Sequence, residues 1–139
     1  AGAAVSAMKC GLLPLSQHAG LIMPTVCVHP YQDVTTAKDE CEALARDIGE
    51  NFAMIMENHG LLACGRSIGE CFYYLYYLET ACKIQVDVLA SGQEPLLLSD
   101  KIVDGLFADG DVPKNEPSGA EDWKPQLRWV DRNMPGYRD

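Results

Sequence analysis

The sequence predicts an α/β protein in which helices cover both faces of a small sheet. Short apolar stretches bounded by Gly and Pro alternate with stretches whose apolar residues recur every three or four positions. Two of the apolar stretches, FAMIM at 52–56 and LLACG at 61–65, also lack the alternating polar residues of a strand with one solvated face. A sheet that is apolar on both faces needs a helical layer on each side, so we expect an α/β/α domain.

The first third of the chain predicts one helix and two strands. Residues 1–11 have a helical pattern that Gly11 would close, because Gly readily adopts the left-handed conformation found at helix ends. LLPLSQ (12–17) and MPTVCVH (23–29) predict short strands separated by Pro and Gly.

A helix and a strand reversal follow. Thr36-x-x-Asp39 is similar to a capping box, and the apolar spacing after it predicts a helix that ends at Gly49. Between FAMIM and LLACG, Asn58 and Gly60 flank His59, and both residue types tolerate the positive φ of a tight turn. An imidazole has no packing role at such a turn, which makes His59 a candidate functional residue.

The clearest helix covers roughly 68–90 and begins at the capping box Ser67-x-x-Glu70. Its predicted buried stripe is Ile68, Cys71, Phe72, Leu75, Leu78, Cys82, Val86 and Leu89. The tyrosines around this stripe are Tyr73, Tyr74, Tyr76 and Tyr77. They indicate either core packing with an amphipathic rim or a helix buried against a neighbouring subunit, where Tyr is enriched.

The remaining chain predicts a helix, a linker and a tail. Residues 98–109 have helical spacing, with Ser99 or Asp100 as the cap. We expect residues 1–110 to form the domain and 111–122, rich in Pro, Gly and acids, to form a linker. Residues 123–139 carry two Trp and one Tyr, and we expect this tail to pack on the domain or on a neighbouring subunit.

Composition limits the classes of function. The 139 residues include 20 acidic and 11 basic side chains, a net charge of −9, which argues against nucleic acid and anionic membranes as partners. No apolar run approaches the roughly 20 residues that a membrane span requires. The six cysteines form no CxxC pair and most lie in apolar runs, so we expect reduced core thiols and a cytoplasmic protein.

The three histidines are the candidate metal ligands. His18, His29 and His59 are each expected at the end of a strand, where a rigid backbone can direct an imidazole toward a metal. Their separations match neither H-x-H nor H-x-x-x-H, so spacing alone favours a hydrogen-bonded structural role for each. His59, beside Glu57 and Asn58, is the best single candidate.

One long stretch, ENHGLLACGRSIGECFYYLYYLETACKIQ, resembles the class II aldolase/adducin family. That family shows an NHG or HHG turn after a strand, then LLxxG, then a helix with LExAxxxQ. The matching residues here are Asn58, His59, Gly60, Leu61, Leu62, Gly65, Leu78, Glu79, Ala81 and Gln85. AVSAMKCGLLPLSQHA resembles the family segment that follows its H-x-H metal motif, and the tail resembles that of larger bacterial adducin-like members. The resemblance implies a class II aldolase-like fold with a mostly antiparallel central sheet.

The resemblance also implies a divalent metal, zinc or another such as manganese, held by three histidines. His59 matches the third ligand. The H-x-H ligands and the catalytic Glu of the family would precede Ala1, so the chain is expected to be the C-terminal portion of a member, inactive alone. Leu15-Ser16-Gln17-His18 stands where sugar-phosphate aldolases carry a tyrosine, which argues against that substrate class, and Tyr31 lies in the loop that matches the family's YHDYEG.

Two functions are therefore expected as alternatives. The first is a metal-dependent carbon–carbon lyase of aldolase type, or a related decarboxylase or epimerase, that acts on a small hydroxy-carbonyl substrate and assembles as a homotetramer. The second is a non-catalytic adducin-like scaffold that assembles through its tyrosine-rich helix.

Overall fold

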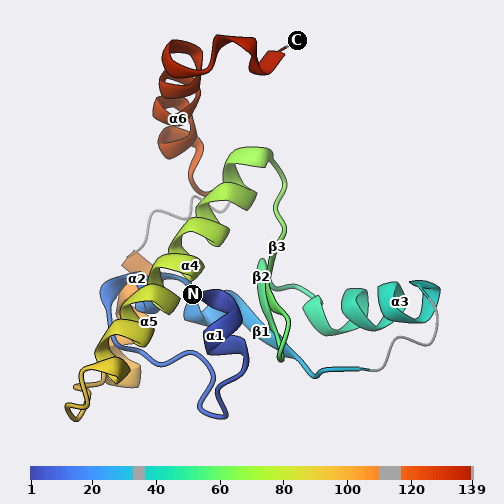
Figure 1. Ribbon diagram of the computed structural model, residues 1–139. Helices are drawn as coiled ribbons and strands as arrows, with labels where there is room; N and C mark the ends of the chain where they lie inside the picture. Colours follow the sequence, from blue (N-terminus) through green and yellow to red (C-terminus); the bar gives the residue numbers. More distant parts are fainter. Residues whose placement is uncertain (33–36, 110–116, 139) are drawn as a thin grey trace.

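The chain forms a three-stranded sheet with helices on both sides. A computed structural model describes residues 1–32, 37–109 and 117–138. The strands are β1 (Val26–His29), β2 (Ala53–Met56) and β3 (Gly60–Ala63), in the order β1-β2-β3. β1 pairs with β2 in parallel and β2 pairs with β3 antiparallel, so the described sheet is mixed. Figure 1 shows α3 (Ala37–Ile48) on one side of the sheet and α4 (Ile68–Ala90) on the other, which confirms the layered α/β prediction.

The β2–β3 hairpin has the predicted turn. Asn58 has a φ of 54° and Gly60 a φ of 148°, so both residues use the positive-φ region that the sequence anticipated for them. Met56 pairs with Gly60, which leaves Glu57, Asn58 and His59 as the tip. The tip is therefore fixed by backbone geometry and by the strands on either side.

The N-terminal prediction was partly wrong. Helix α1 covers only Gly2–Ser6, although Gly11 does adopt a φ of 61° further along. The expected strand at 12–17 is absent, because Ser16 instead caps the helix α2 (Gln17–Ile22) by accepting a 3.2 Å hydrogen bond from Ala19 N. A short 3-10 helix, Met23–Thr25, then takes the first residues of the second expected strand, so β1 begins at Val26.

The two long predicted helices are confirmed in extent. α3 ends at Ile48, and Gly49 follows it with a φ of 49°. Thr36 of the proposed capping box lies outside the described residues. At the start of α4, Ser67 Oγ accepts a 3.1 Å hydrogen bond from Glu70 N, as predicted. In a capping box the Glu70 carboxylate would accept a hydrogen bond from Ser67 N. Here it accepts one from Arg66 N instead, at 2.6 Å.

The buried face of α4 is rotated from the predicted stripe. Ile68 is 72% exposed and Leu75 42% exposed, whereas Tyr74 is buried. The residues buried on this helix are Gly69, Glu70, Tyr74, Leu78, Ala81, Cys82 and Gln85. Tyr74 stacks on Phe52 with ring centroids 4.8 Å apart, so the aromatic ring packs in the core rather than on the rim. The helical spacing was right, and the angular position of its apolar face was wrong.

The core lies between α4, the sheet and the N-terminal helices. Its buried apolar residues are Val5, Ile22, Ala53, Ile55, Tyr74, Leu78 and Cys82. Burial raises the pKa of Cys82 to about 11, so this thiol stays protonated. All six cysteines are free, as expected, but Cys10, Cys41 and Cys64 are exposed rather than buried in the core.

The C-terminal part contains two further helices. α5 (Asp100–Asp109) confirms the expected helix and contacts α2. α6 (Ala120–Asn133), followed by the 3-10 helix Pro135–Arg138, lies near the N-terminal end of α4 in Figure 1. Residues 111–116 of the expected linker lie outside the described residues, and the helix begins before residue 123. The division into domain, linker and tail stays a prediction.

A buried carboxylate joins this C-terminal part to α4. The Glu70 side chain is fully buried and accepts hydrogen bonds from Arg66 Nη2 at 2.8 Å and from Ser118 N at 3.0 Å. Tyr74 Oη lies 3.4 Å from Ser118 Oγ. Burial alone would raise the pKa of Glu70, but the hydrogen bonds from Arg66 and Ser118 outweigh it and hold the pKa below its usual value.

We expect Glu70→Gln to lower the free energy of unfolding by about 2 kcal/mol near neutral pH, because an amide donor would face the donors of Arg66 and Ser118. A carboxyl whose pKa is lowered by folding contributes stability above its unfolded pKa and loses it as pH falls through the folded pKa. The difference between variant and wild type should therefore shrink in acid. Urea unfolding of the intact protein measures it, with exposed Asp87→Asn as the control. If the free energies of unfolding of wild type and variant differed by the same amount at every pH, Glu70 would not be charged in the folded protein.

Candidate functional site

His59 occupies the exposed tip of the β2–β3 hairpin. Its backbone N–H donates to Met56 O at 3.1 Å, and the preceding N–H of Asn58 donates to Ser6 O at 3.0 Å. Glu57 N donates to His29 O at 2.9 Å, which ties the start of the tip to the end of β1. The backbone that carries the imidazole is therefore held on three sides while the imidazole itself remains accessible.

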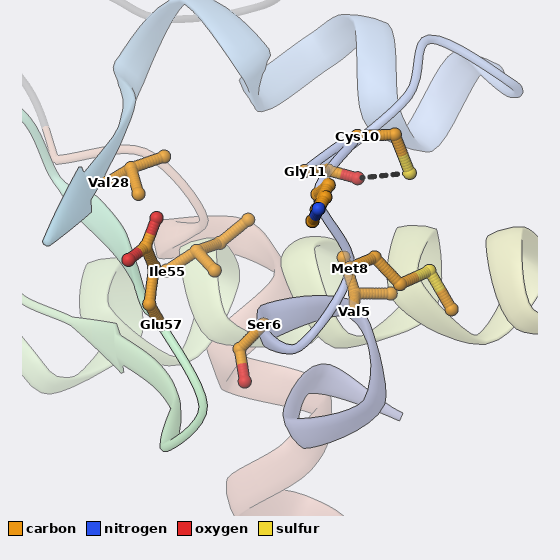
Figure 2. Close-up of a pocket in the computed structure, with 9 residues that line it drawn as sticks. Val5, Ser6, Met8, Cys10, Gly11, Val28, Ile55 and Glu57 are labelled. Atoms are coloured by element: carbon orange, nitrogen blue, oxygen red, sulfur yellow. Dashed lines mark hydrogen bonds between the residues drawn. The ribbon is translucent and has the colours of Figure 1, made fainter. Parts of the chain in front are cut away.

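A pocket of about 290 Å³ lies beside this tip. In Figure 2, Val28, Ile55 and Glu57 line one side, and the segment after α1 lines the other. The lining residues are Val5, Ser6, Met8, Lys9, Cys10, Gly11, Val28, Ile55 and Glu57. A neighbouring hollow of about 210 Å³ shares several of these residues. The lining combines an apolar surface with a carboxylate and an ammonium group, as small-molecule sites commonly do.

The structure does not bring the three histidines together. His29 is 6% exposed, and its Nδ1 lies 2.7 Å from Asp47 Oδ2 on α3. His18 lies in the first turn of α2, with its ring centroid 5.7 Å from that of Tyr77. Across residues 1–32, 37–109 and 117–138, no group of three or more His, Cys, Asp or Glu side chains is placed to hold a metal ion. The structural interpretation therefore holds for His29, and His18 is away from the expected strand end.

His59 fits the role of one metal ligand, and only one. A neutral imidazole on a rigid, exposed turn is a suitable donor for zinc or manganese. A selective site requires three or four donors in a fixed geometry. The described residues provide no such set around His59, so a complete site would need donors from outside them.

Sequence reasoning missed two residues that shape this region. Asp47 was not singled out, although a carboxylate near the end of the predicted helix could have suggested a partner for a nearby histidine. Gln85 entered only as part of a family pattern. Its signal was present, since it follows Leu78 and Cys82 at helical spacing and is a polar residue on an apolar face.

The comparisons with known proteins identify the class. Residues 1–86 match the model of the Class II Aldolase and Adducin N-terminal domain. A Caulobacter vibrioides protein that carries a class 2 aldolase name is 35% identical over 143 residues, which cover 99% of this chain and 54% of that protein. Rat alpha-adducin is 45% identical over 103 residues, covering 72% of this chain and 14% of the adducin.

A solved structure agrees. The crystal structure of an aldolase II superfamily protein from Pseudomonas syringae has a TM-score of 0.88 at 34% identity, over 99% of this chain and 55% of that one. The chain belongs to the class II aldolase/adducin family, and its fold is the aldolase II fold. It spans about half the length of the bacterial relatives that it matches. Within the described residues, no helix is both long and apolar enough to cross a membrane.

The His29–Asp47 pair predicts a pH-dependent stability. The hydrogen bond to His29 is the largest cause that lowers the pKa of Asp47; burial opposes it and Arg46 adds to it. This contribution is present above the unfolded pKa of Asp47 and is lost as pH falls through its lower folded value. We therefore expect Asp47→Asn to lower the melting temperature at neutral pH and to match wild type in acid. Thermal unfolding across pH measures this, with exposed Asp104→Asn as the control; a constant gap would contradict it.

Proposed function

We propose that the intact protein is a divalent-metal-dependent carbon–carbon lyase of aldolase type, or a related decarboxylase or epimerase, acting on a small hydroxy-carbonyl substrate. The observation that carries this proposal is His59, an exposed imidazole on a turn whose backbone is bonded to Ser6, Met56 and, through Glu57, His29. Membership of the class II aldolase/adducin family supports it. The acidic composition and reduced thiols are consistent with a cytoplasmic location, which belongs to the same proposal.

Aldolase-type chemistry would use the metal ion, His59 and the adjoining pocket in different ways. A bound divalent cation supplies a Lewis acid that stabilises the charge developing on oxygen when a bond next to a carbonyl breaks. His59 would contribute one neutral donor, which leaves the full charge of the cation available. The adjoining pocket is of a size for a small molecule, and Lys9 and Glu57 provide polar groups on its lining.

Metal binding tests the proposal. We expect the intact protein to hold one divalent ion per chain and His59→Ala to lose at least ten-fold in zinc affinity, because one of three donors is removed. Metal analysis and competition with a chromophoric chelator measure this. His18→Ala is the matched control, since that ring lies against Tyr77 rather than at the turn. Equal zinc affinity of wild type and His59→Ala would reject the proposal.

A second candidate function is a non-catalytic adducin-like scaffold. The identity to alpha-adducin and the exposed apolar residues on α4 favour it. Ile68, Leu75 and Tyr76 are 72%, 42% and 54% exposed. Phe72, Leu75 and Tyr76 also line a hollow of about 200 Å³ on this face of the helix. Absence of stoichiometric metal from an intact, folded protein would favour the scaffold over the lyase.

Both candidate functions predict a homo-oligomer, proposed as a tetramer. If the exposed face of α4 forms the contact, Leu75→Asp should dissociate it, because a buried unpaired charge opposes association. Asp104→Lys, exposed on α5 rather than on α4, is the control and should leave the assembly unchanged. Sedimentation velocity measures the result. A wild-type monomer would contradict the proposed homo-oligomer, whereas a Leu75→Asp oligomer of unchanged size would place the contact elsewhere.

A further inference from the structure

Two polar side chains on α4 hold the segment 1–13 against the body of the protein. Gln85 is completely buried, and its side chain forms its hydrogen bonds with this segment. Its Oε1 accepts from Leu13 N at 2.7 Å, and its Nε2 donates to Gly11 O at 2.8 Å. The same Nε2 lies 3.5 Å from Met8 Sδ. A single amide therefore fixes the backbone that forms one wall of the 290 Å³ pocket.

Glu79 holds the other end of the segment, two turns earlier on α4. Its Oε2 accepts a hydrogen bond from Gly2 N at 2.8 Å. A carboxylate at this end of α1 satisfies N–H groups that a helix leaves unbonded. Gly2 also packs closely on β3, since a Cβ at this position would lie 2.3 Å from Leu61 Cγ. Glu79 therefore bonds to the start of the segment 1–13, and Leu61 lies close against it.

The held segment is in turn bonded to the His59 turn. The carbonyl oxygen of Ser6, the last residue of α1, accepts a hydrogen bond from the N–H of Asn58. Asn58 has the left-handed φ of 54° that brings the chain around to His59. Any shift of α1 along β3 therefore changes the hydrogen bond that supports the residue next to His59. Helix α1 can move little sideways relative to β3, because Val5, the neighbour of Ser6, is fully buried in the core.

We propose that Glu79 and Gln85 are positioning residues for the His59 turn, acting through the segment 1–13 and not by contact with His59. The consequence for metal binding by His59 rests on the proposed function. The constraint that the two side chains place on the backbone of the turn does not. Neither side chain lines the 290 Å³ pocket, so an effect on ligand binding there must pass through the segment.

Hydrogen exchange of the intact, metal-free protein provides the first test. We expect amides of residues 56–61 to exchange about ten-fold faster in Glu79→Ala and in Gln85→Leu, because the Asn58 N–H loses a fixed acceptor. Glu79→Gln keeps an acceptor for Gly2 N and should restore much of the protection. Asp87→Asn, exposed on the same helix, is the matched control. Unchanged exchange of 56–61 in folded Glu79→Ala would overturn the proposal, even if the melting temperature falls.

Zinc affinity of the same variants provides the second test. We expect a loss of roughly ten-fold in Glu79→Ala and Gln85→Leu, the size seen when groups that support a ligand are removed. If Gln85→Leu does not fold, Glu79→Ala and Glu79→Gln decide the outcome. Wild-type zinc affinity in both folded variants would overturn the positioning role. If instead His59→Ala itself binds zinc with wild-type affinity, the proposed function is wrong. Hydrogen exchange of residues 56–61 then remains the test of whether Glu79 and Gln85 position the turn.

Discussion

The packing of α4 against the β2–β3 hairpin is the interaction on which the other parts depend. A three-stranded sheet with four-residue strands cannot shield its own apolar face, so it requires a long helix laid across it. Tyr74 and Leu78 are buried on the side of α4 that covers the sheet, with Tyr74 stacked on Phe52 directly before β2. Once α4 is fixed, two of its buried polar side chains bond to the segments on either side. Glu70 holds the C-terminal part and Gln85 holds the N-terminal segment.

Buried polar groups thus determine the orientation of α4, whereas apolar packing provides its stability. The apolar contacts of Leu78 and Cys82 have little direction of their own, so they restrict a rotation of α4 less sharply than hydrogen bonds do. The Gln85 amide does not permit this, since its donor and acceptor each face a particular backbone group. In the described residues no buried side-chain nitrogen or oxygen lacks a hydrogen-bond partner. A fully bonded set of this kind defines one orientation of the helix.

The sequence predicted the elements better than their contacts. The hairpin, α3, α4 and α5 follow from local signals: the NHG turn, helical spacing and Ser67 as a cap. Residues 12–17 were misread because a Leu- and Pro-containing stretch suits a strand or an extended loop equally, and only Ser16 marked the coming helix. The buried face of α4 was misplaced because Tyr74 can occupy core or rim, and the choice depends on Phe52, 22 positions away. His59 could be singled out locally, but Asp47, Glu79 and Gln85 act on residues that no local pattern reveals.

The separation along the chain between α4 and the segment that it holds determines the order in which the protein can fold. The bonds from Glu79 to Gly2 and from Gln85 to Leu13 span 77 and 72 residues. During synthesis the β2–β3 hairpin can therefore form before α4 is available, whereas the segment 1–13 gains its bonds to Glu79 and Gln85 only once residues 79–85 have emerged. Non-local contacts of this length slow folding and leave apolar surface uncovered in the meantime. The segment 1–13 therefore keeps part of its apolar surface uncovered until α4 is in place, which lengthens its exposure to misassociation or chaperone binding.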